Sequence, residues 1–578
     1  MSRRHNRSGS IYTITVGCCL IVTVLGYSAL TLVRVQRQTV TSNNRASLAT
    51  RAALSGLQMA FYRIKTESNW RTKLRNGQWD SDQSTDWWDS GMLRFTGVDP
   101  IDNDLLDSDV DPVVITATGK SGDAVQIKTA TIEFRREGIR CLESSLHANG
   151  VLTINGSTVR SDNIISSNSA IEALNGAQVH APAEAARSVS NDFTSIYHRG
   201  TSTSGTWPRD MPNVSKVLDA YPSATLINFR DLPNNNVLSN PGKEDGTTNW
   251  PPLISCNVID TGNANTGQKA LWVTNRSSTL DGPCQEVSAH LVNGQTYYVE
   301  TWIRRWHLEE NCRLMLRITD GKGTYDVPMT NWVKCPQSSY GKISGSQTVT
   351  FTAPLGSAKL FVETQASTLP YAMDDTYLCS GTAPLHYLEK VVLSPGSNPY
   401  GRSNDKGLYR INCEGPLVVR DMRCAGTLLI TNPSPLTIEG AVHLQPAQAS
   451  WDVSGENYPA LIVSGNATIK TDGNDLSEAT HSVNFNSAGS PYLGSQDSDI
   501  TDLYPNRIHG LVYVSGDLAF ENQPCIRGAV IAGGNIGVTS GELTVTYDPT
   551  YLKQNAAPGF VSGIVPKFTR GSFKRATN

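Results

Sequence analysis

The chain of 578 residues is too long for a single hydrophobic core and predicts about three or four domains. Its net charge of −3 hides an asymmetry, because residues 1–75 hold 12 Lys or Arg and one acid, whereas the remainder holds 37 basic and 51 acidic residues. A basic end beside a hydrophobic run, followed by an acidic remainder, argues against nucleic-acid binding and favours attachment to a membrane.

The hydrophobic run follows a basic segment at residues 1–7. Residues 8–33 carry no charge over 26 positions, and about 20 apolar residues suffice to span a bilayer. We therefore predict a transmembrane helix over 8–33. A cleaved signal peptide is the alternative, but its apolar core is shorter, and here Arg34 and Arg37 follow the run directly. The large, β-rich, cysteine-containing remainder predicts a single-pass membrane protein with a cytoplasmic basic tail and an extracytoplasmic bulk, in the periplasm or at the cell surface.

The next residues predict an amphipathic stalk helix over 34–66, because Ala53, Leu57 and Ile64 recur at helical spacing. A membrane helix that continues into such a stalk resembles the N-terminus of type IV pilin-like proteins, the minor pilins in particular. The resemblance implies a pilin-like α/β or β region over 67–139 and other pilin-like proteins as partners.

Two residues decide how far this resemblance extends. Gly9 sits where the cleavage glycine of a prepilin would, whereas Ile14 stands where such pilins carry an acidic residue. Processing and polymerisation are therefore open, and a plain signal-anchor helix is an equal alternative.

Six aspartates fall between positions 99 and 111. Carboxylates at this density invite a calcium interpretation, but they do not match the D-x-[DN]-x-[DN]-G loop with its distal Glu. We therefore favour a solvated acidic turn for this segment.

A glycine-punctuated pattern of short strands occupies residues 140–225 and 397–563. An apolar-x-Gly core recurs as INGSTV, IEGAVHL, VSGNATI, VSGDLAF and IRGAVI. Short strands with a glycine turn, stacked on their neighbours, predict a β-solenoid or β-helix body. A β-sandwich with many hairpins is the alternative. A basic tail over 564–578 completes the chain.

The segment between these two parts reads as an insertion over 226–396. The order NPGKEDGTTNW, GQKALWVTNRS, LVNGQTYYVETWIRRW, AKLFVETQ and YAMDDTYL resembles the CenC-type carbohydrate-binding modules, which are galactose-binding-like jelly rolls. Lys243 departs from the family, which usually has an aromatic residue there. The resemblance implies a structural calcium ion, and the matching positions are Glu244 and Asp374 or Asp375; a turn-capping role for these acids is the alternative.

The strands of this insertion alternate between apolar and mixed residues, which is the mark of half-buried strands. Aromatic rings therefore lie among charges on one face, where a ring can stack on a sugar and charged groups can bond its hydroxyls. The carbohydrate-binding residues that we predict are Trp272, Tyr298, Trp302, Arg304, Trp306 and Phe361. Packing in the core is the alternative for each tryptophan singly.

Cysteines and catalytic motifs add little. Five of the eleven cysteines crowd residues 256–379 without a C-x-x-C motif, which favours disulfides over a zinc site. We find no G-x-S-x-G, H-E-x-x-H or G-x-G-x-x-G, and we assign no catalytic residue.

The chain as a whole predicts a mainly β fold with an N-terminal transmembrane helix and stalk, a β-solenoid body and an inserted β-sandwich jelly roll. The predicted function is a membrane-anchored surface protein that binds polysaccharide or a cell-surface glycan without cleaving it. The alternatives are a polysaccharide-degrading hydrolase or lyase on a β-helix, and a structural envelope or pilus-associated component.

Overall fold

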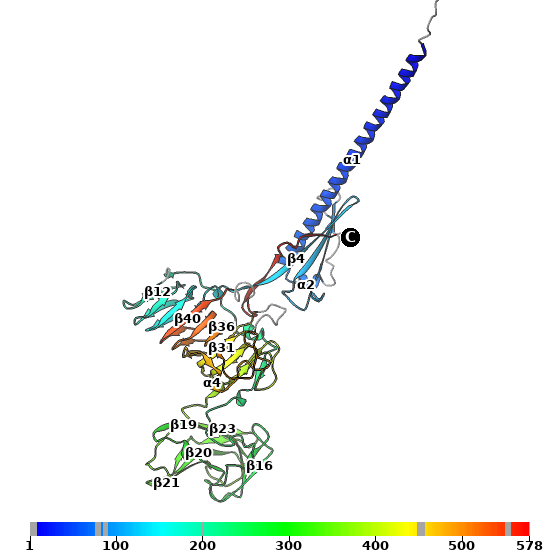
Figure 1. Cartoon of the computed structure of the whole chain (residues 1–578). Helices are drawn as coiled ribbons and strands as arrows, with labels where there is room; N and C mark the ends of the chain where they lie inside the picture. The colour runs from blue at the N-terminus through cyan, green and yellow to red at the C-terminus, as the bar shows by residue number, and fades with distance from the viewer. Residues whose placement is uncertain are drawn as a thin grey trace, which may run out of the picture. The chain divides into compact units, whose positions relative to one another are not determined.

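The computed structural model describes residues 8–74, 83–84, 91–198, 202–447, 457–549 and 556–576. The cytoplasmic tail predicted over residues 1–7 lies outside the described residues. The chain is mainly β and forms two compact units (Figure 1). The first unit comprises residues 1–138, 554–556 and 561–578, and the second comprises residues 139–553 and 557–560.

The first unit begins with α1 (Ser8–Thr66), a helix of 59 residues. The predicted membrane segment and the predicted stalk are thus one uninterrupted helix (Figure 1). Its N-terminal part is long and apolar enough to cross a bilayer, a criterion that a signal sequence also meets. The hydroxyls in this part bond within the helix, since Thr15 Oγ1 donates to Ile11 O at 2.8 Å and Thr23 Oγ1 donates to Cys19 O at 2.7 Å. Bonded in this way, they add no unpaired donor to an apolar surface.

The C-terminal half of α1 packs on an antiparallel sheet of order β1-β2-β3-β4-β41, with β42 also paired to β4. The predicted stripe of Ala53, Leu57 and Ile64 is buried against it and is confirmed. The other elements of this unit are α2 (Trp70–Lys73), β1 (Gln83–Ser84), β2 (Gly91–Val98), β3 (Val113–Ser121), β4 (Ala124–Gly138), β41 (Val561–Phe568) and β42 (Lys574–Ala576).

The C-terminal residues complete this sheet and are not a tail. We predicted a basic tail over 564–578, but β41 pairs with β4 from Gly138↔Val561 to Ile132↔Phe568. Most residues of β41 are exposed, so the strand lacks the apolar alternation that would identify it in the sequence.

Most of the second unit is a parallel-stranded body, the name we use for β5–β15, β26–β33 and β36–β40. Its first strands are β5 (Leu146–Ala148), β6 (Leu152–Asn155), β7 (Thr158–Ser161), β8 (Ile165–Ser167), β9 (Ala170–Leu174), β10 (Gln178–His180), β11 (Ala183–Ala185), β12 (Ser188–Asn191), β13 (Ile196–Tyr197) and β14 (Ser202–Ser204). The strands that follow are β15 (Thr225–Ile227), β26 (His386–Glu389), β27 (Val392–Leu393), β28 (Leu408–Asn412), β29 (Leu417–Ala425), β30 (Thr427–Thr431), β31 (Leu436–Gln445), β32 (Leu461–Ser464), β33 (Ala467–Thr471), β36 (Arg507–Val514), β37 (Leu518–Phe520), β38 (Cys525–Ala532), β39 (Ile536–Val538) and β40 (Glu542–Tyr547). Small elements beside them are α3 (Val214–Asp219), α4 (Glu478–His481), β34 (Leu476–Ser477) and β35 (Leu503–Tyr504).

In the early strands of this body, the chain returns to the same ladder at a nearly constant interval. Leu146 pairs with Ile165, Ile165 with Ala183, and Ala183 with Ser202, so each return takes 18 or 19 residues. The inward side chains of successive strands form one apolar core. Each short strand thereby buries a face that it could not bury alone.

The recurring glycine of the sequence pattern has a structural reason here. Gly510 and Gly528 lie opposite each other on β36 and β38, and both have a positive φ, of 128° and 146°. A Cβ on Gly528 would stand 2.0 Å from the Gly510 carbonyl oxygen. Only glycine allows the two strands this approach.

The body is closed by strands that are remote in the sequence. The last strands, β38, β39 and β40, pair in parallel with the first, β5, β6 and β7, through Val530↔Leu146, Ile536↔Leu152 and Leu543↔Val159. The early strands β5–β14 therefore extend from one side of β38–β40, and the later strands extend from the other.

Between β15 and β26 lies a β-sandwich, which confirms the predicted β-sandwich module. One five-stranded sheet contains β16 (Asn257–Thr261), β17 (Ala270–Thr274), β25 (Tyr371–Ser380), β19 (Gln295–Arg305) and β23 (Gly341–Val349). The other contains β18 (Cys284–Glu286), β24 (Ser357–Thr364), β20 (Glu310–Asp320), β21 (Gly323–Pro328) and β22 (Val333–Cys335). The predicted limits of 226–396 are too wide, because β15, β26 and β27 pair within the parallel-stranded body.

The cysteines are free thiols in the structure, where we expected disulfides. Cys312 and Cys335 are nonetheless neighbours on paired strands of the second sheet. Their mutual hydrogen bond and their burial raise the pKa of the Cys335 thiol.

Gly119 on β3 gives a test of how α1 sits on its sheet. A Cβ at this position would stand 2.1 Å from the Ala49 carbonyl oxygen and 2.4 Å from the Ala53 nitrogen. We expect Gly119→Ala to push the helix away and to lower the free energy of unfolding of the first unit by about 1–3 kcal/mol. Hydrogen exchange of the helix amides around these residues measures the change.

The matched control is Gly563→Ala on β41, where a Cβ would meet nothing within 4 Å. This variant should keep the amide protection of the unmodified protein. Equal protection of α1 in the two variants would contradict the close approach of helix and sheet.

Candidate functional site

One face of the sheet that contains β16, β17, β25, β19 and β23 is exposed to solvent, and we call it the exposed face. On β19 the side chains alternate as the sequence predicts. Val299 and Ile303 are fully buried in the sandwich core, whereas Tyr298, Trp302 and Arg304 point the other way and are partly exposed. Because neighbouring strands pair in register, residues of β16, β17, β25 and β23 line up beside these three.

An aromatic cluster occupies one end of the exposed face. Trp272 on β17 and Arg304 on β19 both pair with Ala372 on β25, and the small side chain of Ala372 lets its neighbours close over it. The ring centroids of Trp272 and Trp306 are 4.9 Å apart with an interplanar angle of 71°, and Arg304 Cζ lies 5.1 Å from the Trp306 ring. Trp306 keeps 44% of its surface exposed, and Ile259 beside Trp272 keeps 52%.

Hydrogen-bonding groups border this cluster. Arg304 Nη1 donates to Asn263 Oδ1 at 2.8 Å, and Tyr340 Oη donates to the Asn263 carbonyl at 2.6 Å. Among the described residues, no carboxylate forms a salt bridge with Arg304. The guanidinium is therefore positioned by an uncharged partner and keeps its charge available.

A second group of polar and aromatic residues lies further along β19. Tyr298 Oη donates to Glu300 Oε2 at 2.5 Å, and Lys342 Nζ lies 2.6 Å from the same oxygen. Lys342 pairs with Trp302 across β19 and β23. Burial and the bond to Glu300 raise the pKa of Tyr298, and burial raises that of Tyr377 to about 12. Both phenols are therefore neutral at physiological pH, and the proton of Tyr298 is already donated to Glu300.

A cavity of about 620 Å³ opens over this second group. Its walls include residues 228–231 and 414–416, which belong to the same compact unit as the sandwich. On the sheet side it is lined by Tyr298, Glu300, Trp302, Lys342 and Tyr377. A space of this size is within the range of small-ligand sites.

A buried ion pair holds the turn that carries Trp306. Arg305 and Glu310 close the β19–β20 turn with a charged hydrogen bond, and Arg305 is fully buried. Arg305 Nη1 also donates to the Leu369 carbonyl at 3.0 Å, and Glu310 Oε1 accepts from the Ser367 amide at 2.7 Å. These bonds attach the turn to the segment before β25 and thereby fix the position of Trp306.

Phe361 is the predicted site residue that the structure places elsewhere. It lies on β24 of the other sheet and is fully buried in a small cluster with Cys284 and Met315. Phe361 lies on the opposite face of β24 from Leu360 and Val362, as the alternation predicts, but Leu253 and Leu280 pack over it and cover that face. We therefore remove Phe361 from the candidate set.

Sequence reasoning missed several residues of the exposed face, namely Ile259, Asn263, Tyr340, Lys342 and Tyr377. One signal was present for Lys342, since it alternates with Ser344 and Ser346 in the segment GKISGSQ. The contributions of Asn263 and Tyr340 come from connections outside the strands, where no periodicity applies.

The carboxylates predicted to hold calcium instead fasten a loop to β25. Glu244 Oε1 accepts from the Gln268 amide at 2.9 Å, and Asp374 Oδ2 accepts from the Asn265 amide at 2.8 Å. Asp375 Oδ1 accepts from a hydroxyl of the same loop at 2.7 Å. In the described part of the chain, the acids whose ligand atoms gather as three lie elsewhere. Capping of the loop, the alternative role for these three carboxylates, is the one that these bonds support.

Lys243, the departure from the family pattern, contributes a cation at this place. Its side chain is fully buried, with Nζ 3.9 Å from the Trp250 ring centroid and 2.9 Å from Thr376 Oγ1. Burial lowers the pKa of Lys243 to about 7, and burial together with the charge of Asp375 raises that of Asp374 to about 7. Lysine here packs on Trp250 and places an amine near the two aspartates.

Comparison with known proteins identifies this module. A family model described as a carbohydrate binding domain matches residues 235–371. The chain is 26% identical over 191 residues to endo-1,4-beta-xylanase A of Thermoanaerobacterium saccharolyticum, covering 30% of this chain and 16% of the xylanase. It is 27% identical over 154 residues to exoglucanase XynX of Acetivibrio thermocellus, covering 25% of this chain and 14% of that protein. The chain thus spans less than a fifth of these relatives and shares a carbohydrate-binding module with xylanases.

Solved structures of similar modules were also found. The CBM22-1 xylan-binding domain of Paenibacillus barcinonensis Xyn10C is 16% identical with a TM-score of 0.22, covering 24% of this chain and 88% of that domain. The C-terminal family 22 carbohydrate binding module of Clostridium thermocellum Xyn10B is 17% identical with a TM-score of 0.24, covering 26% and 98%.

Loss of Glu310 should loosen the turn that presents Trp306. We expect Glu310→Ala to lower the free energy of unfolding of the sandwich by about 3–5 kcal/mol, because it leaves Arg305 buried without its partner. Chemical denaturation followed by tryptophan fluorescence measures the loss. Glu309→Ala is the matched control, because Glu309 pairs with Lys334 at an exposed position, where the loss should be about 0–1 kcal/mol.

The same substitution has a pH signature. Burial raises the pKa of Glu310, but hydrogen bonds from Ser367 and from the Ala366 amide outweigh it. The pKa of Glu310 therefore lies below its ordinary value of 4.5. The stabilisation from this carboxylate is therefore complete above pH 4.5 and is lost as pH falls below that value. The stability difference between the unmodified protein and Glu310→Ala should shrink in acid, and a constant difference would contradict the ion pair.

Proposed function

We propose that the exposed face binds a polysaccharide, that this polysaccharide is of the 1,4-β-linked xylan class, and that the module does not cleave it. The observation that carries the proposal is the pairing of exposed aromatic rings with positioned hydrogen-bonding groups inside a matched carbohydrate binding domain. The choice of xylan rests on the relatives that share the module, which are named as xylanases.

The aromatic cluster supplies a stacking platform. A pyranose ring offers a flat C–H face that packs on an indole, and such contacts contribute beyond the apolar area that they bury. Trp272 and Trp306 meet edge to face at 71°, so their rings form a corner and not a flat shelf. Such a corner suits a chain whose successive sugar rings are rotated relative to one another.

The polar groups of the exposed face can orient a bound sugar through its hydroxyls. Arg304 offers a charged donor, and Tyr298 and Lys342 frame Trp302 with donors bound to Glu300. A sugar hydroxyl both donates and accepts, so it can bond to these groups without disturbing the Glu300 pair. The exposed face thus combines a surface for the sugar ring with partners for its hydroxyls along one strand.

The bonding of two acids of this module supports binding without cleavage. A glycosidase needs two carboxylates free to act as acid and base or nucleophile. Glu300 is 7% exposed and bound by Tyr298 and Lys342, and Asp374 is fully buried and bonded to a loop amide. Neither is free to exchange a proton with a bound sugar.

We also propose that the protein is anchored in a membrane by the N-terminal part of α1, with the sheet of the first unit and the second unit on the extracytoplasmic side. The uncharged run over 8–33 and the exposure of its large apolar side chains from Ile11 to Val33 support the anchor. A helix that lies on an antiparallel sheet supports the relation to pilin-like proteins, and regular returns of 18 or 19 residues support a β-solenoid for the parallel-stranded body. Processing at Gly9, tested by mass spectrometry of the mature N-terminus, would distinguish a pilin-like anchor from a plain one.

Affinity electrophoresis of the full chain in detergent through gels containing soluble xylan tests the binding face. We expect xylan to retard the unmodified protein and Trp272→Ala or Trp302→Ala to weaken binding by about tenfold each, equivalent to about 1.4 kcal/mol. Trp332→Ala is the matched control, because Trp332 stacks on Arg313 of the other sheet and should leave the retardation unchanged.

The outcomes separate the candidate functions. Unretarded migration in xylan and in a panel of other polysaccharides would contradict glycan binding and leave a structural component. Retardation with new reducing ends released from the same polysaccharide would instead establish an enzyme, against the non-catalytic part of the proposal.

A further inference from the structure

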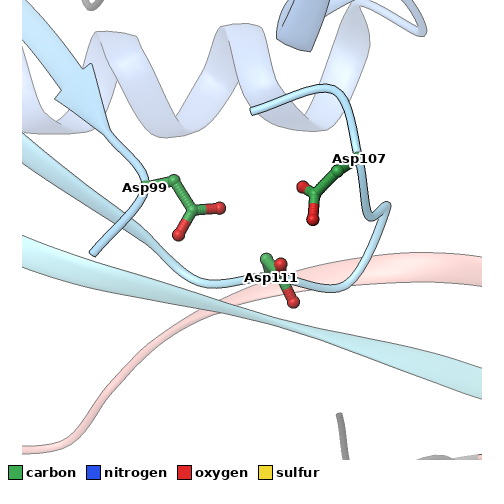
Figure 2. Close-up of side chains that lie close together, drawn as sticks. All are labelled: Asp99, Asp107 and Asp111. Atoms are coloured by element: carbon green, nitrogen blue, oxygen red, sulfur yellow. The ribbon is translucent and has the colours of Figure 1, made fainter. Parts of the chain in front are cut away.

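Three aspartates of the first unit gather at the end of β2 and in the segment that leads into β3. Each of Asp99, Asp107 and Asp111 offers a carboxylate oxygen, and these oxygens all lie within 4.8 Å of one another. Figure 2 shows the carboxylate of Asp99 directed towards Asp107, with Asp111 beside them. The sequence favoured a solvated acidic turn here, and the structure instead concentrates negative charge around one point.

Asp99 is the residue that distinguishes this cluster from an ordinary acidic surface. Its side chain is fully buried, and its Oδ1 accepts a hydrogen bond from the Ile101 amide at 2.7 Å. Its Oδ2 is buried and has no hydrogen-bond partner. A buried carboxylate oxygen without a partner costs free energy, and a cation bound between the three acids would satisfy it.

The guanidinium of Arg71 holds the segment 99–111 in shape without forming a hydrogen bond to the three carboxylates. Arg71 of α2 donates through Nη1 to the Leu105 carbonyl at 3.1 Å and through Nη2 to the Asp111 carbonyl at 2.8 Å. Its guanidinium also lies 4.6 Å from the Trp70 ring centroid and 4.8 Å from that of Phe134. Arg71 thus fixes the main chain of the loop, and the described bonds of its guanidinium go to carbonyls and not to the three carboxylates.

Two other acids of the loop are engaged elsewhere. Asp109 pairs with Arg136 at 2.8 Å, and Asp104 Oδ1 accepts from the Leu106 amide at 2.9 Å.

We propose that Asp99, Asp107 and Asp111 bind a divalent cation of the calcium class. Calcium takes oxygen ligands at about 2.3–2.6 Å, so two oxygens on opposite sides of the ion lie about 4.6–5.2 Å apart. Three carboxylate oxygens that all lie within 4.8 Å of one another can therefore ligate one calcium ion together. The bound ion ties the end of β2 to the start of β3 across the segment 99–111.

Isothermal titration calorimetry of the full chain in detergent, first stripped with a chelator and then titrated with calcium chloride, tests the site. We expect one binding event in the first unit, and we expect calcium to raise the thermal unfolding temperature of that unit. Asp107→Asn and Asp111→Asn should each weaken binding by at least about tenfold. Asp107 is exposed, so its substitution leaves folding intact even where Asp99→Asn does not.

Asp104→Asn is the matched control, because asparagine keeps the acceptor for the Leu106 amide and Asp104 is outside the cluster. This variant should bind calcium like the unmodified protein. The proposal is overturned by a titration without binding heat, or by equal loss of affinity in Asp104→Asn. It is likewise overturned by a calcium signal that survives Asp107→Asn but disappears in Asp375→Asn, which would place the ion in the sandwich.

Discussion

The pairing of β38–β40 with β5–β7 is the interaction on which the second unit depends. These ladders join Val530 to Leu146 and Leu543 to Val159, and without them the early and the late strands would be separate stacks with open ends. Open parallel strands expose unpaired amide and carbonyl groups. The body therefore cannot be completed until the last strands of the chain are available, and the inserted sandwich depends on a host closed by residues far beyond it.

Two different interactions position the residues of the exposed face of the sandwich. Strand geometry places Trp302, Tyr298 and Arg304 on the same face, because they alternate on one strand in the middle of a sheet. Trp306 lies beyond that strand and needs the Arg305–Glu310 pair to fix its turn. One part of the exposed face is thus a product of regular β geometry, whereas the other part depends on a buried charge pair whose two members must both be present.

The local features of the chain could be predicted from the sequence, and the non-local ones could not. The helix stripe at Leu57 and the alternation along β19 are periodic, so the sequence displays them directly. The strand β41 is mostly exposed and shows no such period, and Phe361 points outward as its alternation predicts but is covered by Leu253. The gathering of Asp99 with Asp107 depends on how a turn folds between two strands, which spacing alone does not determine.

The sandwich leaves and rejoins its host at one place, since Asn234 bridges His386 and the Val237 amide donates to the Leu378 carbonyl at 2.9 Å. The second unit is joined to the first in the same manner, because β4 leads out of the first sheet and β41 leads back beside it. The junction between the sandwich and the body and the junction between the two units are therefore each crossed by two backbone connections. Mechanical load applied to the sandwich is therefore shared between two backbone connections at both junctions, so no single peptide linker carries the whole force at either of them.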